Sequence, residues 1–208
     1  MANSWRYLEF AIANQFYVIA ESNGVDFYKI YQAIKYKYPR ANGYKAPGFA
    51  AGPCLFKDTM QLASYFDHQF MMGHSAMLVN EGLATFAVNK ALALFDKDLW
   101  GKKVGILGMT FKPGNDDIRE SLSFKVKKAL EFNGAEVIWH DPYLGDSSKL
   151  EDVLSAECVI LGTPHKEYRD LKIDRPLVDV WGIYSKPELE VLPGKIEEKS
   201  KIRKEVNE

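Results

Sequence analysis

The sequence has few cysteines, no long apolar run and almost no net charge, and each of these absences excludes a class of protein. Cys54 and Cys158 are the only cysteines in 208 residues, too few for a disulfide-stapled scaffold, and we expect both to be reduced in a cytoplasmic protein. No apolar stretch reaches the roughly 20 residues of a transmembrane helix, and the first residues lack the pattern of a signal peptide. A formal net charge of -1 provides no basic surface for nucleic acid. We therefore predict neither a membrane nor a nucleic-acid partner.

The sequence also lacks a metal-binding motif and a complete dinucleotide-binding motif. Its four histidines have no ligand spacing with one another or with the cysteines, so we expect no metal site. Only a G-x-x-G, from Gly105 to Gly108, stands where a dinucleotide-binding turn would read G-x-G-x-x-G. Hydrophobic residues make up 47% of the chain, which is enough to bury a core.

Hydrophobic periodicity divides the chain into a helical part and an α/β part. Apolar residues at helical spacing predict helices in the first part at residues 3–22, 26–37, 55–67 and 73–96. In the second part, strands are predicted at residues 103–108, 135–140, 158–162 and 177–181, with helices at 120–133 and 149–156. We therefore expect a helical domain over residues 1–97, followed by a small Rossmann-like domain with a parallel sheet over residues 98–208.

The first predicted helix is apolar on two flanks and so requires burial on both. Trp5, Ile12 and Phe16 belong to one flank, and Tyr7 and Phe10 belong to the other. A second subunit can cover one of them, so we predict a homodimer through the helical domain. The chain enters this helix almost at its first residue, which we interpret as a cut within a longer protein.

Cys54 is the first candidate for chemistry. It follows a loop rich in glycine, proline and alanine, residues 38–53, and opens a predicted helix. A helix N-terminus stabilises a thiolate, and Lys57 adds a positive charge in the first turn. Asp58, four residues on, shares the helical face and can hold a water for attack on a covalent intermediate. The alternative is that Cys54 is a small buried residue at a helix start.

A second candidate site follows the first predicted strand. Ligands of open α/β sheets bind beyond the carboxyl ends of the strands. Lys112 and Arg119 lie at that edge, before a helix that begins near Ser121, and can meet phosphates there. The neighbouring Asp116 and Asp117 are typical of residues that complement a helix dipole. The alternative for this segment is a solvated loop with ordinary surface charge.

These segments together resemble one family, the UDP-glucose/GDP-mannose dehydrogenases. The segment from Gly48 to Asp58, GFAAGPCLFKD, resembles the family's active-site loop G-F-G-G-S-C-x-x-K-D. Further segments resemble the family's L-G-x-x-F-K-P, D-D-x-R-E-S, D-P and N-E motifs, in that order: Leu107–Pro113, Asp116–Ser121, Asp141–Pro142 and Asn14–Gln15. The resemblance extends from about residue 3 to residue 184.

The resemblance implies an oxidoreductase that converts the 6-hydroxyl of a nucleotide sugar to a carboxylate in two hydride transfers to NAD, for polysaccharide precursor synthesis. Cys54 would trap the aldehyde as a thiohemiacetal, and Asp58 and Asn3 would order the water that hydrolyses the later thioester. UDP-glucose is the first expectation for the substrate, with UDP-N-acetylhexosamines and GDP-mannose as alternatives.

The resemblance also implies binding roles for several residues. Arg119 would contact the pyrophosphate of NAD. Arg40 would reach into the site of the neighbouring subunit. The residues implied to hold the nucleotide sugar are Arg40, Lys45, Gly48, Phe49, Gly52 and Lys112.

The sequence departs from the family pattern in several places. The family's NAD-binding domain and a lysine that helps to activate water would precede Asn3, so we expect this chain alone to be inactive. Ala50 and Ala51 replace a Gly-Gly pair, and Pro53 replaces a serine or histidine. Trp181 stands where many members have a substrate-contacting arginine.

The sequence is also compatible with two other functions. One is a non-catalytic module for nucleotide-sugar binding or dimerisation, in which Cys54 is inert. The other is a dehydrogenase that acts on an ordinary hydroxy acid without a covalent cysteine. We interpret Cys158, within an apolar strand, as structural, and the charged segment from Lys195 to Glu208 as a solvated tail.

Overall fold

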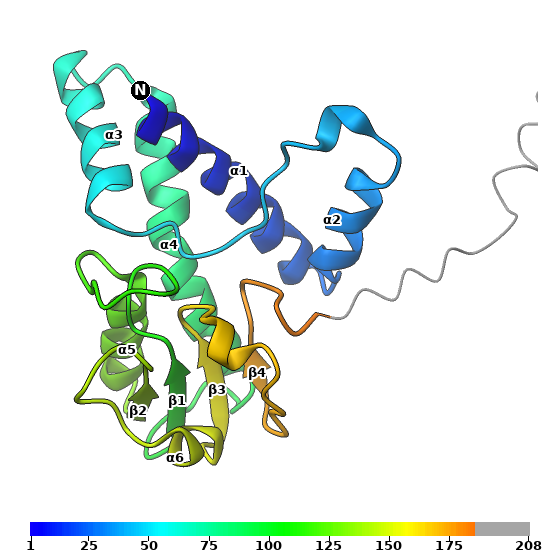
Figure 1. Cartoon of the computed structure of the whole chain (residues 1–208), viewed down its shortest axis with the longest axis vertical. Coiled ribbons are helices and arrows are strands. Elements are labelled where there is room, and N and C mark those ends of the chain that lie inside the picture. The colour runs from blue at the N-terminus through cyan, green and yellow to red at the C-terminus, as the bar shows by residue number, and fades with distance from the viewer. Residues whose placement is uncertain (186–208) are drawn as a thin grey trace, which may run out of the picture.

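A computed structural model describes residues 1–185, in a group of long helices and a small parallel sheet (Figure 1). The predicted charged tail lies outside the described residues. The helical part contains a 3-10 turn, η1 (Pro39–Ala41), and four helices: α1 (Ala2–Ser22), α2 (Phe27–Lys35), α3 (Pro53–Tyr65) and α4 (Met71–Ala93). Among residues 1–185, no helix is both long and apolar enough to cross a bilayer.

Local sequence signals set the ends of these helices. α1 ends before Gly24, which has a left-handed φ of 70°. α2 begins after Asp26, whose side chain accepts a hydrogen bond from the N–H of Tyr28. Pro53 occupies the first position of α3, where the N–H that proline lacks would have no helical partner. The start of α3 therefore falls immediately before Cys54.

Helix α4 joins the two parts of the molecule. Its first half packs with α1 and α3 around a small cluster that includes Tyr7 and Ala76. Its second half packs against α5 (Leu122–Phe132) and the sheet, where Leu83 shares a core with Ile106. The predicted boundary between residues 97 and 98 falls in the connection between α4 and the first strand, and it stays a prediction.

The sheet has four parallel strands in the order β2-β1-β3-β4. The strands are β1 (Lys103–Leu107), β2 (Glu136–His140), β3 (Cys158–Leu161) and β4 (Leu177–Val178). Strand β3 is buried at every position, and β1 at all but its first, as expected of central parallel strands covered on both faces. The predicted fold class, helices followed by a Rossmann-like parallel sheet, is confirmed.

Alternate side chains of the central strands enter two separate cores. Ile106 and Ile160 pack against α5 and α4 on one face. Leu107 and Leu161 pack on the other face with Tyr168 of η2 (Lys166–Tyr168) and with α6 (Leu150–Leu154). The carboxyl ends of the strands point towards the helical part, so the loops that follow the strands lie on that side of the sheet (Figure 1).

The last predicted strand, residues 177–181, is wrong beyond Val178. The carboxylate of Asp179 accepts hydrogen bonds from the N–H groups of Trp181, Gly182 and Tyr184, at 2.8 to 3.0 Å. These bonds fold the chain into a turn, because they use backbone donors that would otherwise extend the strand.

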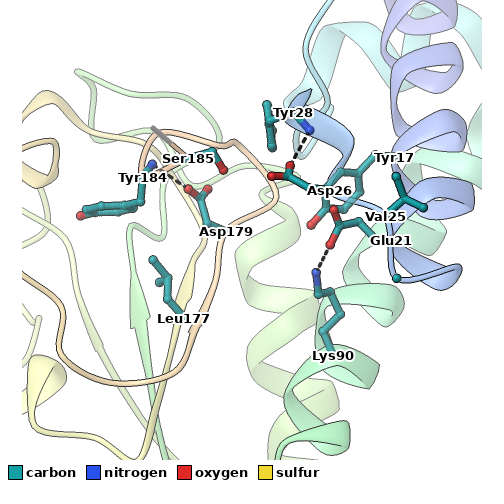
Figure 2. Close-up of a pocket in the computed structure, with 11 residues that line it drawn as sticks. Tyr17, Glu21, Val25, Asp26, Tyr28, Lys90, Leu177, Asp179, Tyr184 and Ser185 are labelled. Atoms are coloured by element: carbon teal, nitrogen blue, oxygen red, sulfur yellow. Dashed lines mark hydrogen bonds and ion pairs between the residues drawn. The ribbon is translucent and has the colours of Figure 1, made fainter. Parts of the chain in front are cut away.

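This turn forms a second contact between the two parts. The Tyr28 hydroxyl donates to the carbonyl oxygen of Val180 at 2.7 Å. A β-carbon at Gly182 would lie 2.1 Å from the Tyr28 ring, so glycine is required there. An adjoining cavity has a volume of about 460 Å³. Figure 2 shows residues that line it, among them the ion pair of Glu21 and Lys90.

Candidate active site

A cleft of about 590 Å³ lies between the helical part and the loops that follow the strands. It brings together segments far apart in the sequence: the start of α1, the loop before α3, the loop after β1, and the turn after β4. Its lining residues include Asn3, Arg6, Phe10, Phe49, Gly52, Cys54, Phe111, Lys112, Asn115, Asp117, Arg119 and Trp181. The cleft therefore brings Cys54 of the first predicted site together with Lys112 and Arg119 of the second, whereas Asp58 is not among its lining residues.

Cys54 lines this cleft at the second position of α3 and is exposed. The alternative that it is a buried residue is therefore wrong. Gly52 precedes the helix with a φ of 97°, which favours glycine. A β-carbon there would also lie 2.6 Å from the ring of Phe111. Glycine thus lets the loop pass close to the segment that follows β1 and keeps Cys54 beside that segment.

Two buried asparagines anchor the Cys54 loop to the helices. The N–H of Gly48 donates to Oδ1 of Asn14 at 2.8 Å, and Nδ2 of Asn14 donates to the Gly48 carbonyl oxygen at 3.0 Å. Asn14 also donates to Asn80 at 2.9 Å, and Asn80 donates to the carbonyl oxygen of Tyr7 at 3.0 Å. A fully partnered buried network of this kind favours one loop geometry. The backbone of Gly48, next to the lining residue Phe49, is therefore held in one position by Asn14.

Trp181 holds the same loop from the side of the sheet. A β-carbon at Gly48 would lie 2.2 Å from the Trp181 ring, and the rings of Phe49 and Trp181 meet edge to face with centroids 6.2 Å apart. The indole N–H donates to the carbonyl oxygen of Gly162 at 2.9 Å. Trp181 thus connects the Cys54 loop to the end of β3, in addition to lining the cleft.

Asn3 and Asp58, both predicted to be catalytic, are in direct contact. Nδ2 of Asn3 donates to Oδ2 of Asp58 at 2.7 Å. Asp58 lies four residues after Cys54 on α3, so the two share a helical face. Lys57 Nζ is 4.0 Å from the Asp58 carboxylate and is largely exposed, so this ion pair contributes little to stability.

The loop after β1 contributes cations to the cleft. Arg119 makes a bidentate pair with Asp117, with a shortest distance of 2.7 Å. The hydrogen bonds from Arg119 lower the pKa of Asp117 to about 2, while the hydrogen bond and charge of Asp117 raise the pKa of Arg119. Lys112 is exposed, with Nζ 5.3 Å from the Phe111 ring centroid. With Arg6, the lining holds three cations against one carboxylate, which suits a diphosphate.

Some predicted residues lie elsewhere, and some lining residues were missed. Arg40 and Lys45 are exposed and do not line the cleft of the single chain, and their roles stay predictions. Arg6 and Phe10 were missed as site residues. They follow Asn3 at helical spacings of three and seven, a pattern that places all three on one face of α1.

Two family models match the chain. The central domain of the UDP-glucose/GDP-mannose dehydrogenase family matches residues 1–82. The UDP binding domain of the same family matches residues 105–186. The matches follow the division into helices and sheet, and the cleft lies between them.

Relatives named as UDP-sugar dehydrogenases match most of this chain. It is 30% identical over 175 residues to UDP-N-acetyl-D-mannosamine dehydrogenase of Methanocaldococcus jannaschii, covering 82% of this chain and 40% of the relative. It is 31% identical over 169 residues to UDP-glucose 6-dehydrogenase of Rhizobium meliloti, covering 70% of this chain and 38% of the relative.

Solved structures agree with this similarity. A UDP-glucose dehydrogenase from Pyrobaculum islandicum superposes with a TM-score of 0.76 and 28% identity, covering 86% of this chain and 46% of that one. A UDP-D-ManNAc dehydrogenase from Pyrococcus horikoshii gives a TM-score of 0.79 and 27% identity, covering 91% and 48%. The matched part thus spans less than half the length of each of these four relatives.

Proposed function

The chain belongs to the UDP-glucose/GDP-mannose dehydrogenase family, and on that basis we propose that it supplies the catalytic cysteine and the nucleotide-sugar site of an NAD-dependent 6-dehydrogenase. The observation that carries this proposal is the cleft in which Cys54 meets Lys112 and Arg119. The proposed substrate is UDP-glucose, and UDP-N-acetylmannosamine is the second candidate because several relatives act on it. The product is a uronic acid for polysaccharide synthesis, made in the cytoplasm.

The cleft suits the two chemically distinct ends of a nucleotide sugar. The cations of the lining, Arg6 and Lys112 among them, offer partners for the diphosphate. Phe49 and Gly52 form the wall next to Cys54, where the sugar would lie. Trp181 adds an apolar surface to that wall, and pockets for small molecules combine such surfaces with a few polar groups.

Cys54 provides a nucleophile for the second oxidation. Its sulfur adds to C6 of the aldehyde, the C–S bond forms, and the aldehyde oxygen takes a proton to become the hydroxyl of a thiohemiacetal. Loss of hydride from C6 and of the hydroxyl proton leaves a thioester on Cys54. Water then attacks the thioester carbon, and the C–S bond breaks to release the carboxylate and the thiol.

Asn3 and Asp58 are proposed to serve the hydrolysis. The Asp58 carboxylate can accept a proton from the attacking water. One N–H of the Asn3 amide is bound to Asp58, which leaves the second to donate to the oxyanion that forms at C6. The 2.7 Å contact between them would keep both groups aimed at the same carbon.

NAD, when bound, accepts the hydride in each of the two oxidations. Of the described residues we assign only Arg119 to the cofactor. Its side chain is 72% exposed, and its bonds to Asp117 use Nε and Nη2, so Nη1 can meet a pyrophosphate oxygen. The 208 residues contain no G-x-G-x-x-G turn, and we expect no NADH when this chain alone is given NAD and UDP-sugars.

A second copy of the chain would complete the assembly. Large apolar side chains of α1 are exposed, with Trp5 at 60% and Phe16 at 50%. We propose that this face forms a homodimer, and that Arg40 and Lys45, which lie outside the cleft of their own chain, act at the substrate site of the assembled dimer.

The proposed nucleophile can be tested without NAD. UDP-glucose oxidised to the aldehyde at C6 and labelled there with ¹³C is added to the purified chain. We expect a new ¹³C signal for the sulfur-bonded C6, absent with Cys54→Ser, whereas Cys158→Ser leaves it unchanged. If the probe competes with UDP for the cleft but gives no such signal, Cys54 is not the nucleophile and the chain is a binding module.

A further inference from the structure

A buried acid–histidine pair lies behind the loop that carries Lys112, and no step proposed above uses it. Asp141 follows β2 and is 1% exposed, and His165 follows β3 and is fully buried. Nε2 of His165 lies 3.1 Å from Oδ2 of Asp141. Because β2 and β3 flank β1, both side chains lie next to the loop that leaves β1.

The carboxylate of Asp141 holds the beginning of this loop. Oδ2 accepts hydrogen bonds from the N–H groups of Met109, at 2.7 Å, and Thr110, at 3.1 Å. Oδ1 accepts from the N–H of Tyr143 at 2.9 Å. Burial raises the pKa of Asp141, but the hydrogen bonds from His165 and the backbone outweigh burial, and the net pKa is lowered. Asp141 is therefore an ionised anchor.

The ring of His165 holds the rest of the loop. Nδ1 accepts the N–H of Gly114 at 3.2 Å, so in the neutral ring the proton is on Nε2, which faces Asp141 and the Thr110 hydroxyl. That hydroxyl donates to the carbonyl oxygen of Lys112 at 3.1 Å. Thr110 and Gly114, which lie two residues before and two residues after Lys112, are thus both hydrogen-bonded to the His165 ring.

Aromatic packing fixes the ring itself. The centroid of Tyr143 lies 5.0 Å from that of His165, and Tyr168 meets the ring edge to face at 5.6 Å. A buried ring held on several sides cannot rotate freely, so its two nitrogens keep their partners.

We propose that Asp141 and His165 are positioning residues, which hold residues 109–114 in one conformation so that Lys112 meets the nucleotide sugar without first ordering its loop. The inference rests on the proposed function in one respect, the assignment of Lys112 to the substrate. A lysine on a preordered backbone loses less conformational entropy on binding than one on a mobile loop. The pair would thus act on affinity through Lys112 and make no contact with the ligand itself.

The first test measures the loop without any ligand. In His165→Ala, hydrogen exchange of the amides of Met109, Thr110 and Gly114, which donate to the pair, should be roughly tenfold faster than in the wild-type chain, while the α5 amides are unchanged. His165→Asn should restore part of the protection, because its Oδ1 can take the place of Nδ1 opposite Gly114. His68→Ala, an exposed histidine in the helical part, is the matched control. Equal protection of the loop in His165→Ala and the wild-type chain would overturn the proposal.

The second test is a double-mutant cycle on UDP-glucose affinity, measured by calorimetry. Lys112→Ala should weaken binding roughly tenfold, and His165→Ala roughly three- to tenfold. If His165 acts through Lys112, the double variant should bind within about twofold of Lys112→Ala alone. Multiplicative losses would contradict the positioning role. If His165→Ala is unfolded, Asp141→Asn replaces it, because an amide cannot accept all the N–H groups that the carboxylate accepts.

The two tests distinguish a failure of the proposed function from a failure of the positioning role of Asp141 and His165. If the wild-type chain does not bind UDP-glucose although exchange shows the loop released in His165→Ala, the proposed function fails and the role of the pair in holding the loop stands. If UDP-glucose binds but the loop is equally protected in every variant, the positioning role fails and the proposed function stands.

Discussion

The side-chain amide of Asn3 donates a hydrogen bond to Asp58 across 2.7 Å, which joins the first turn of α1 to α3 one turn after Cys54. The contact links residues 55 positions apart in the sequence. It joins an amide donor to a carboxylate acceptor on the helix that carries the thiol, and these are the two kinds of group that we propose for hydrolysis of the thioester.

A charge placed at this contact should make stability depend on pH. Asn3→Asp would put two carboxylates within hydrogen-bonding distance, which raises their pKa in the folded state. The variant should lose about 1 kcal/mol of unfolding free energy at pH 7. This loss should shrink as the pH falls through the raised folded-state pKa towards about 4, and it should be absent at about pH 3, where the carboxyls are protonated in both states. Urea denaturation at both pH values measures this. Asn89→Asp, exposed on α4, is the control, and an equal effect of the two substitutions would contradict the contact.

The packing of Trp181 against the Cys54 loop can be tested through glycine. Gly48→Ala should lower the unfolding free energy by roughly 1–3 kcal/mol, because the new β-carbon would lie 2.2 Å from a ring that is itself held in place. Gly43→Ala, with nothing within 4 Å of the new carbon, should change it little. Thermal melts of the two variants decide the matter. Indistinguishable midpoints would show that Trp181 does not press on the loop.

The pairing of Arg119 with Asp117 should be visible in a titration. Arg119 lowers the pKa of Asp117 from its ordinary value of 3.8 to about 2 in the folded chain. A depressed folded-state pKa stabilises the fold above the ordinary value, and this contribution is lost as the pH falls from about 4 towards 2. Carboxyl ¹³C NMR should show the Asp117 midpoint rising towards its ordinary value in Arg119→Gln. Arg6→Gln should leave the Asp117 midpoint unchanged. An Asp117 midpoint that is also unchanged in Arg119→Gln would contradict the pairing.

The sequence predicted the features that depend on local pattern. Long runs of apolar residues at helical spacing marked α1 and α4 within a few residues of their observed ends. Motif order placed Cys54 and Lys112 in one site, and the cleft contains both. Each of these inferences needed only neighbouring residues or an ordered set of motifs.

The sequence did not predict one local side-chain turn, nor the features that depend on contacts between distant residues. Asp179 ended β4 early, because its carboxylate captured backbone donors that a pattern of apolar residues does not reveal. The wall formed by Trp181 depends on packing against Gly48, 133 positions earlier in the chain. Asp141 and His165 meet only because parallel strands bring their ends to one edge.

The alkylation rate of Cys54 in the presence of UDP-glucose is the most direct test of the proposed site. Iodoacetamide should modify the exposed Cys54 in the folded chain, whereas the buried Cys158, whose pKa burial raises to about 12, should stay unmodified as an internal control. Saturating UDP-glucose should slow the reaction at Cys54 roughly tenfold or more, as followed by mass spectrometry. An unchanged rate at Cys54 under saturating UDP-glucose would contradict the claim that this cleft holds the sugar.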